Sequence, residues 1–381
     1  MGLAGADSIN SKALVRVYSS FDKLPSGYTT LFQESGQQRS FFLSQPWFTH
    51  LHQSGLDAVV EQHIYGLEFE EAALAALPMW HRPSPFAALR PKVLTAAANF
   101  YSALFGPVLS AHHAETAQLQ LDVVIQAMAS DKLRWDVIDL HPLEKESEHY
   151  AMLLKAFSHA GMPTMSYFCA GNWFLKVNNR SYQEYFSSLP SQLKNTVKRK
   201  SEALRKSDRL QLVIAKKPDE VAALIESYQQ IYRKSWKQPE PFPEFVPGWI
   251  AQSAKQGWLR LGIATIDGQP AAAQIWLVHQ NKASIYKLAY DEQFAHFSIG
   301  SILTAHLFAH VIDNDRVSEV DFLNGDERYK QDWMSDRREY WGIVAYNTQT
   351  WKGRLAYLIE KSADYAKRII RQSKRITTRS T

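Results

Sequence analysis

The stretch KLAYDEQFAHFSIGSILTAHLFAHVIDNDRVSEVDFLNGDERYKQDW, residues 287–333, decides the fold because it joins the end of a strand to a helix and a second strand. ASIYKLAY (283–290) reads as a strand. Apolar residues three or four apart predict a helix over 299–313, and VSEVDFL (317–323) is the next strand. This alternation is typical of the α/β or α+β class.

The flanking sequence extends the sheet on both sides. WLRLGIATI (258–266) and AAAQIWLVH (271–279) are predicted strands joined by the turn signal Asp267-Gly268. Helices are predicted over 189–207 and 218–236, and a further strand and helix over 342–347 and 349–372. Between them, Gln238–Pro247 contains four prolines and is predicted to be a loop that could lie over a site.

The N-terminal half has a similar, vaguer order, with a helix over 112–130 that leads into a strand over 135–143. That strand carries Asp139, as the strand over 317–323 carries Asp321. We therefore predict a tandem duplication. We expect an N-terminal domain (1–185) that is a degenerate copy of the C-terminal domain (186–348). A basic helix with its tail (349–381) would follow.

Composition favours a globular protein of about two domains, since the 381 residues are 45% hydrophobic and 21% charged. The one cysteine, Cys169, excludes an intrachain disulfide and suits a reducing compartment. No secretory signal and no long uncharged apolar run is visible, so a cytoplasmic protein is expected. His306 and His310 lack acidic neighbours at metal-ligand spacing, and no metal is expected.

Positive charge is concentrated in two places. Residues 352–381 contain nine Lys/Arg and two acids, and a second cluster covers 194–209. The final basic helix could rest on an anionic membrane, at its inner, cytoplasmic face, and both clusters could contact RNA phosphates. Solvated helix faces would give the same pattern.

Two segments carry candidate chemistry. Ser298-Ile299-Gly300-Ser301 opens the helix over 299–313, where free N–H groups and small residues suit a phosphate; ordinary helix capping is the alternative, and it gives the same residues. DFLNGDERYKQDW (321–333) gathers acids, an arginine, a tyrosine and a lysine directly after a strand, where α/β folds place their sites. A polar surface loop is the alternative.

With these motifs in order, the sequence resembles the GNAT acetyltransferase domain of BioF-like and CelD-like bacterial proteins, which are relatives of the FemAB peptidyltransferases. The shared progression is K-x-A-Y, S-x-G-x-x-L, D-F and G-D-x-x-Y-K-x-x-W. The matching residues are Lys287, Ala289, Tyr290, Ser298, Gly300, Leu303, Asp321, Phe322, Gly325, Asp326, Tyr329, Lys330 and Trp333. The resemblance is strong over about 190–335 and weak over the N-terminal half.

The resemblance implies a GNAT acyl-CoA N-acyltransferase fold with two GNAT-like halves in tandem. Acetyl-CoA, or another acyl-CoA, would be the co-substrate, its pantetheine arm along 283–290 and its diphosphate at 297–301. The implied contacts are Leu288, Ala289, Tyr290, Phe297, Ser298, Ile299, Gly300 and Ser301. The chain has one glycine here instead of the usual Arg/Gln-x-x-Gly-x-Gly/Ala pattern, which leaves the donor open.

Acyl transfer to an amine needs a proton acceptor and a group that stabilises the oxyanion. Asp321 or Asp326 could accept the proton, Lys330 could hold a phosphate or the developing charge, and Tyr329 could protonate the leaving thiolate. Asp321 could instead cap a turn, and Tyr329 could be a packed aromatic. Gln274, Lys287 and Trp333 are expected to face the acceptor.

The expected reaction is N-acylation of an amine, such as an amino sugar or precursor in exopolysaccharide or cell-envelope synthesis. Trp236, Trp249 and Trp258 flank the proline-rich loop and could stack on a sugar. One alternative is a FemAB-like aminoacyl-tRNA-dependent transferase, with tRNA as a partner. Another is a non-catalytic GNAT scaffold in an envelope-polymer assembly.

Overall fold

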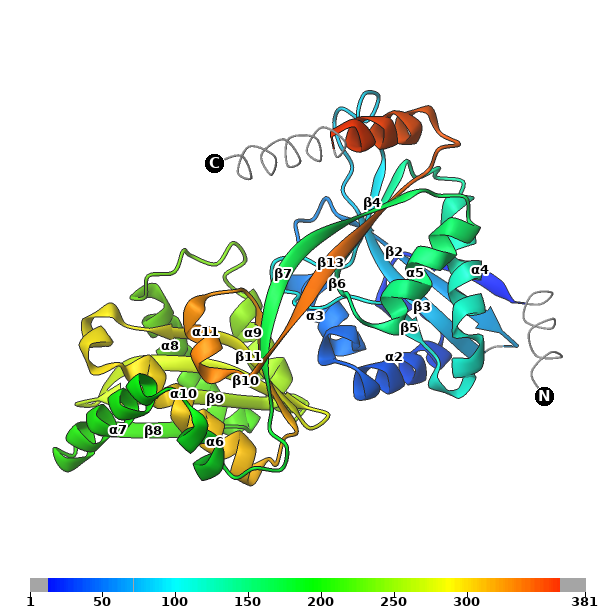
Figure 1. The fold of residues 1–381 in the computed structure, drawn as a ribbon. Helices are drawn as coiled ribbons and strands as arrows, with labels where there is room; N and C mark the ends of the chain where they lie inside the picture. The colour runs from blue at the N-terminus through cyan, green and yellow to red at the C-terminus, as the bar shows by residue number, and fades with distance from the viewer. Residues whose placement is uncertain (1–12, 71, 364–381) are drawn as a thin grey trace, which may run out of the picture. The chain divides into compact units, whose positions relative to one another are not determined.

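The computed structural model describes residues 13–70 and 72–363, apart from the side chains of residues 36–38, and forms two compact units (Figure 1). Within these residues, unit 1 covers 13–35, 57–169 and 340–363, and unit 2 covers 36–56 and 170–339. Each unit contains a run of neighbouring strands with helices packed against it.

Unit 1 has the strand order β1-β2-β3-β4-β6-β13. Every neighbouring pair is antiparallel except β4 and β6, which are parallel. The strands are β1 (Leu14–Tyr18), β2 (Glu61–Phe69), β3 (Ala72–His81), β4 (Val93–Ala96), β6 (Val137–Glu144) and β13 (Asp336–Tyr346), with β5 (Val108–Leu109) beside β3. The helices that begin in this unit include α2 (Ser26–Gln38), α4 (Ala117–Ala129), α5 (Glu148–His159) and the helix over 351–363.

Unit 2 repeats this pattern as β8-β9-β10-β11-β12-β7, again with a single parallel pair, β11 and β12. The strands are β8 (Leu210–Ala215), β9 (Leu259–Ile266), β10 (Gln269–His279), β11 (Lys282–Tyr290), β12 (Glu319–Asn324) and β7 (Thr164–Lys176). The helices are α3 (Gln45–Ser54), α6 (Tyr182–Ser188), α7 (Ser191–Lys206), α8 (Pro218–Arg233), α9 (Phe245–Lys255), α10 (Ile299–Ala309) and α11 (Arg328–Trp333).

The repeated strand order confirms the predicted tandem arrangement, and it adds an exchange of strands. β7 follows β6 in the chain but pairs with β12, whereas β13 follows β12 but pairs with β6. Each unit is therefore completed by a strand from the other half of the chain. For this reason the compact units differ from the ranges 1–185, 186–348 and 349–381. The predicted helix over 349–372 is helical from 351 to 363 and belongs to unit 1; its remainder lies outside the described residues.

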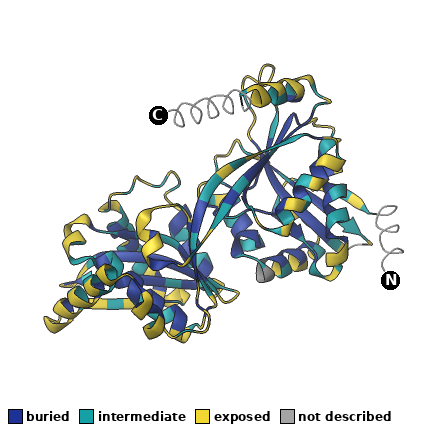
Figure 2. Cartoon of the chain, viewed as in Figure 1, coloured by how far each residue is buried: buried dark blue, intermediate teal, exposed yellow. Residues whose placement is uncertain are grey.

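The core of unit 2 is built around α10, which is apolar on nearly all sides and buries Ile299, Leu303, Leu307 and Phe308. A helix of this composition is expected to be enclosed by other elements. Figure 2 shows the strands of the sheet largely buried. The α-helix ends at Ala309 and continues as a wider π turn through Asn314, so the predicted end at 313 falls in that turn.

The proline-rich segment differs from its prediction. Only its first part is a loop, because α9 begins at Phe245 and contains Pro247. Proline is tolerated in the first turn of a helix, where its missing N–H would have no partner. Among the described residues, no helix is both long enough and apolar enough to cross a bilayer.

Candidate active site

The parallel strands β11 and β12 separate soon after they meet. Their pairing covers three registers, from Lys282 opposite Glu319 to Ser284 opposite Asp321, while β11 continues to Tyr290. On the other side of β11 the register with β10 shifts at Tyr286, the kind of irregularity that bends a strand. The edge of β11 that faced β12 is thus left for another extended chain to pair with.

A small cavity lies where β11 ends and α10 begins. It has a volume of about 200 Å³ and is lined by Tyr290, Ala295, Ser298, Ile299, Gly300 and Ser301. Ser298 adopts a left-handed conformation (φ 54°) and gives no side-chain cap to the helix, so the first N–H groups of α10 are left for other acceptors. We call residues 297–301 the cradle.

Gly300 keeps the cradle open. A Cβ atom at this position would lie 3.2 Å from Cδ1 of Tyr290, so a larger residue would crowd that ring. Two cations lie beside the cradle: Lys200 donates to the carbonyl oxygen of His296, and the guanidinium of Arg209 lies 5.3 Å from the ring centre of Phe297. Because Arg209 is also ion-paired with Asp267, it is the helix terminus, together with Lys200, that favours an anion here.

The predicted contacts are brought together in part. Tyr290, Ser298, Ile299, Gly300 and Ser301 all line the cavity. The side chains of Leu288 and Phe297 pack against the hydrophobic core, and Ala289 is buried. Leu288 and Ala289 can therefore meet a ligand only through their backbone groups on the strand edge.

An aromatic pair connects the cavity to a cluster of charges. The rings of Trp236 and Tyr290 lie 4.6 Å apart, and Lys237 follows in the chain with its amine 5.7 Å from the Trp236 ring centre. Burial, with the nearby Lys287 amine, lowers the pKa of Lys237 to about 8. Glu240, Lys330 and Glu327 also interact electrostatically with Lys237.

This lysine–glutamate cluster combines three amines and two carboxylates: Lys237, Lys287, Lys330, Glu240 and Glu327. Lys287 donates to Glu240, and the Lys330 amine lies 2.9 Å from Glu327. The sequence identified Lys287 and Lys330. The sequence did not identify Lys237 and Glu240. Glu240 belongs to the proline-rich loop that is expected to lie over a site, and Lys237 is the residue directly before that loop.

The side chain of Lys330 is buried. Its amine donates to the carbonyl oxygen of Asn324 at 2.6 Å. Gly325 makes this approach possible, since its φ of 124° is rarely accessible to other residues and an added Cβ would lie 2.5 Å from the Lys330 amine. The loop after β12 is thus shaped to hold this cation.

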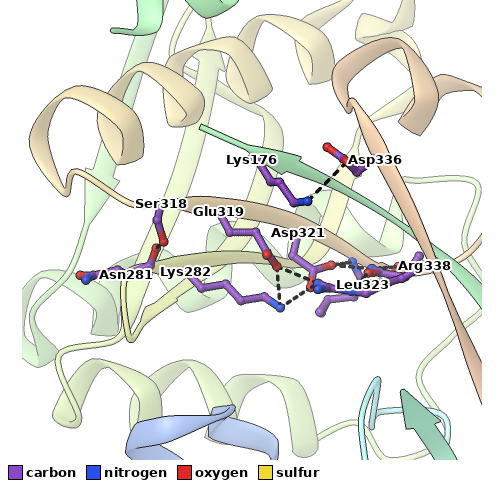
Figure 3. A network of polar contacts seen from close by, with 10 residues as sticks. Lys176, Asn281, Lys282, Ser318, Glu319, Asp321, Leu323, Asp336 and Arg338 are labelled. Atoms are coloured by element: carbon purple, nitrogen blue, oxygen red, sulfur yellow. Dashed lines mark hydrogen bonds and ion pairs between the residues drawn. The ribbon is translucent and has the colours of Figure 1, made fainter. Parts of the chain in front are cut away.

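Asp321 lies in a buried ion network, shown in Figure 3. Its carboxylate lies 2.7 Å from the Lys282 amine and 2.6 Å from Arg338, and it accepts hydrogen bonds from Asn172 and from the N–H of Leu323. Burial alone would raise the pKa of Asp321, but the charges of Lys282 and Arg338 hold it well below its usual range. A carboxylate so fully engaged suits a structural role better than proton transfer.

Asp326 and Tyr329 differ in their suitability for proton transfer. Arg337 binds both carboxylate oxygens of Asp326, each at 2.8 Å, and lowers its pKa, which makes Asp326 a weak base. Tyr329 is 43% exposed and packs edge-on against Phe322 at 5.7 Å. Burial of its hydroxyl, with Glu327, keeps the pKa of Tyr329 above its usual value, so the phenol holds its proton.

Gln274 and Trp333 lie in the core. The Gln274 amide donates to Gly300 at 3.0 Å and to Thr304 at 2.8 Å, and its oxygen accepts from Trp276, which fastens β10 to α10. The ring of Trp333 stacks on Phe308 at 5.3 Å. Both side chains are buried, and neither faces an open site.

The proposed sugar-stacking tryptophans also differ from one another. Trp249 is fully buried, and Trp258 packs beside it and against His279. Trp236 remains about half exposed. It is the most exposed of the three, since Trp258 is partly buried.

Comparison with known proteins agrees with this geometry. Residues 191–331 match the sequence profile of the acetyltransferase (GNAT) domain family, Acetyltransf_6. The match covers α7 through most of α11 and therefore includes the strand opening, the cradle and the lysine–glutamate cluster. This part of the chain is a GNAT-fold acyltransferase domain. No curated protein matches the sequence.

Solved structures support the same fold over most of the chain. FemX superposes with a TM-score of 0.62 at 9% identity, covering 91% of this chain and 100% of FemX. The C-terminal domain (DUF2156) of a protein described as a lysylphosphatidylglycerol synthetase from Agrobacterium fabrum superposes with a TM-score of 0.52 at 11% identity. The match covers 88% of this chain and 96% of that domain. A protein of unknown function from Bacteroides thetaiotaomicron gives 0.55 at 8% identity, covering 87% and 100%.

Proposed function

We propose that this enzyme transfers an acyl group, in the first instance acetyl, from acyl-CoA to an amine. The observation that carries the proposal is the opening between β11 and β12, which leads directly to the cradle at the start of α10. A pantetheine arm contains amides that can pair with a strand edge, and a diphosphate suits a helix N-terminus. The strand edge and the helix N-terminus are adjacent, as the pantetheine arm and the diphosphate are in CoA.

In this proposal the backbone of residues 285–290 binds the pantetheine, and Ser298, Gly300 and Ser301 surround the diphosphate. The thioester then lies towards the lysine–glutamate cluster, because Lys287 is in β11 and Trp236 connects Lys237 to Tyr290. The reacting groups would thus meet next to three amines and two carboxylates.

Residues in and next to this cluster can supply the base, the oxyanion-stabilising group and the proton donor that the reaction needs. The acceptor ammonium gives a proton to a base; its nitrogen attacks the thioester carbonyl, a C–N bond forms and the C–S bond breaks. Lys237, with its pKa near 8, is the proposed base, in preference to Asp321 or Asp326, whose pKa values are lowered. Lys330 stabilises the oxyanion, Tyr329 gives its proton to the leaving thiolate, and the second proton that the attacking nitrogen loses as the amide forms returns to Tyr329.

For the acceptor, we propose an amino sugar or a related precursor amine of exopolysaccharide or envelope synthesis, handled in the cytoplasm. The support is the exposed ring of Trp236 next to the charged cluster. An aromatic face beside hydrogen-bonding groups is suited to a sugar ring.

The test places a carboxylate in the cradle. Ser301→Asp should leave the thermal midpoint unchanged or higher, because an acid near a helix N-terminus is favourable, but it should repel the diphosphate and weaken CoA binding about 100-fold by calorimetry. The matched control, Ser191→Asp, puts the same charge in the first turn of α7, where Ser191 is exposed, and should bind CoA normally. Equal affinity of the two variants would contradict the proposal.

An aminoacyl-tRNA donor is the second candidate, and the exposed cations of α7 favour it. Lys198, Arg199, Arg205 and Lys206 all face solvent. Phosphate contacts of this kind give an affinity that falls steeply with salt concentration. Tight, salt-sensitive binding of tRNA without any CoA binding would favour this donor, and binding of neither ligand would favour a scaffold.

A further inference from the structure

The helix over 351–363 in unit 1 exposes an apolar stripe. Trp351, Leu355, Leu358 and Ile359 follow helical spacing on one face and are between 49% and 65% exposed. The other face packs tightly: a Cβ at Gly353 would lie 2.2 Å from the carbonyl oxygen of Asn347. Packing on the domain therefore fixes the helix and leaves this stripe facing outward.

A neighbouring loop enlarges the apolar surface. Residues 82–92 present Phe86 and Leu89, which are 60% and 80% exposed. Lys352 ties this loop to the helix by donating to the carbonyl oxygens of Ala87 and, at 3.2 Å, Arg90. Figure 2 shows the helix that follows β13 coloured mainly as exposed and intermediate. Contiguous exposed apolar side chains of this size usually mark an interaction site.

Cations lie next to these apolar side chains. A cavity of about 930 Å³ between the loop and the start of the helix is lined by five basic residues, Arg82, Arg90, Lys92, Arg134 and Lys352, and two acids, Glu61 and Asp136. One acid is already engaged, since Asp136 accepts a hydrogen bond from the N–H of Lys92 at 2.7 Å. Within the described part of the chain, the guanidinium of Arg134 has no hydrogen-bond or ion-pair partner. The cavity is therefore suited to an anionic group.

The sequence continues this charge beyond residue 363. Residues 364–381 contain Lys367, Arg368, Arg371, Lys374, Arg375 and Arg379 against Asp364. Large apolar side chains combined with clustered Lys and Arg are the composition of a surface that lies on an anionic bilayer.

We propose that this docking face, formed by residues 82–92, Arg134 and 351–363, binds the surface of an anionic phospholipid bilayer. The apolar stripe with Phe86 and Leu89 enters the interface between headgroups and acyl chains. Arg90, Arg134 and Lys352 then meet lipid phosphates. The inference concerns unit 1 and does not depend on the acyl-transfer proposal for unit 2.

The test measures co-sedimentation of the full chain with vesicles of phosphatidylcholine alone or with phosphatidylglycerol added. The wild type should bind the anionic vesicles much more tightly than the neutral ones. The double variant Leu355→Glu/Ile359→Glu should reduce that partitioning by about tenfold or more. The matched control is Val213→Glu in β8 of unit 2, a similarly exposed apolar residue, which should bind like the wild type.

A second variant tests the charges separately. Arg90→Gln/Arg134→Gln should weaken binding to anionic vesicles by roughly tenfold, with little change on neutral vesicles, and added salt should remove most of the difference. Equal wild-type binding to both vesicle types, or wild-type partitioning by Leu355→Glu/Ile359→Glu, would overturn the proposal. So would self-association in solution that this variant abolishes, because a second copy would then cover the stripe.

The two proposals fail separately. Unchanged thermal stability of the variants shows that they are folded, and an unchanged thermal shift with CoA shows that unit 2 retains its ligand. Loss of vesicle binding with CoA binding intact would support the docking face on its own.

Discussion

Units 1 and 2 share one strand order but differ at the place where a GNAT site is expected. In unit 2, β11 leads through the 3-10 segment Glu292–Phe297 directly into α10, and Gly300 and Ser301 line a cavity. In unit 1, the chain after β4 passes through β5 and a 3-10 turn before α4, whose first residues, Thr116 and Ala117, are buried. The two units therefore share a strand order but differ in how the chain enters the helix that follows the third or fourth strand, and only in unit 2 do residues of the first helical turn line a described cavity.

The parallel strand pairs show the same contrast at the level of single residues. Asp139 stands opposite Thr95 in unit 1 as Asp321 stands opposite Ser284 in unit 2. Asp139 is partly exposed and accepts a hydrogen bond from Tyr167 at 2.8 Å, whereas Asp321 is fully buried between two cations. Equivalent positions have thus acquired different roles.

The largest expected effect comes from breaking the buried network. Asp321→Ala should lower the free energy of unfolding by about 3–5 kcal/mol, because it leaves Lys282 and Arg338 without their shared carboxylate. Asp139→Ala should cost only about 1 kcal/mol, the loss of a partly exposed hydrogen bond. Urea unfolding of both variants measures the difference. Similar costs would mean that the two positions are energetically equivalent.

Next in size is the loss of the buried amine after β12. Lys330→Met keeps the length of the side chain but removes its charge, and kcat/KM should fall about 100-fold if this amine stabilises the oxyanion. The control in unit 1 is Lys145→Met, which follows β6 and whose amine lies 3.9 Å from the ring centre of Trp341. That variant should retain full activity. Equal losses in both would place the catalytic role of Lys330 in doubt.

Much of unit 2 could be predicted because its signals are local. The turn at Asp267-Gly268, the strand ending at Tyr290 and the apolar spacing of α10 each depend on neighbouring residues, and the structure contains all of them. The small residues at 298–301 likewise marked a helix start with room for a ligand. Local sequence was sufficient for the elements and for the cradle.

The remaining site could not be predicted because it depends on partners far away in the chain. The Asp321 carboxylate accepts hydrogen bonds from Arg338 and from Asn172, which lies 149 residues earlier in the chain. These contacts give Asp321 a structural role. Gln274 is enclosed by Thr304 and Trp276, contacts that no strand pattern reveals. Strand exchange was equally invisible, because the periodicity of β7 and β13 does not say which sheet each strand joins.

A smaller effect is expected from pH, through Lys237. If its neutral amine is the base, kcat/KM should rise about tenfold per pH unit below its pKa near 8 and then level off, and Lys237→Met should lack this limb. The unfolded chain should keep the ordinary pKa of 10.5, so folding releases a proton between about pH 8 and 10.5, and the stability contribution of this group rises with pH in that window. A limb retained by Lys237→Met would assign it to another group.

The smallest expected effect uses helix caps to ask whether the units unfold together. Ser147 caps α5 in unit 1 and Ser181 caps α6 in unit 2, and replacing either with alanine should cost about 1 kcal/mol. Unit 1 needs β13, which follows most of unit 2 in the chain, and unit 2 needs β7, which precedes it. Neither unit can form from one continuous segment, so both variants should shift the same single urea transition.

Fluorescence and circular dichroism would measure that transition. The two signals should coincide in the wild type and in both variants. If Ser147→Ala moved one of two resolved steps and Ser181→Ala moved the other, the units would be independent folding units in spite of their exchanged strands. The exchange would then follow folding and would not be a requirement for it.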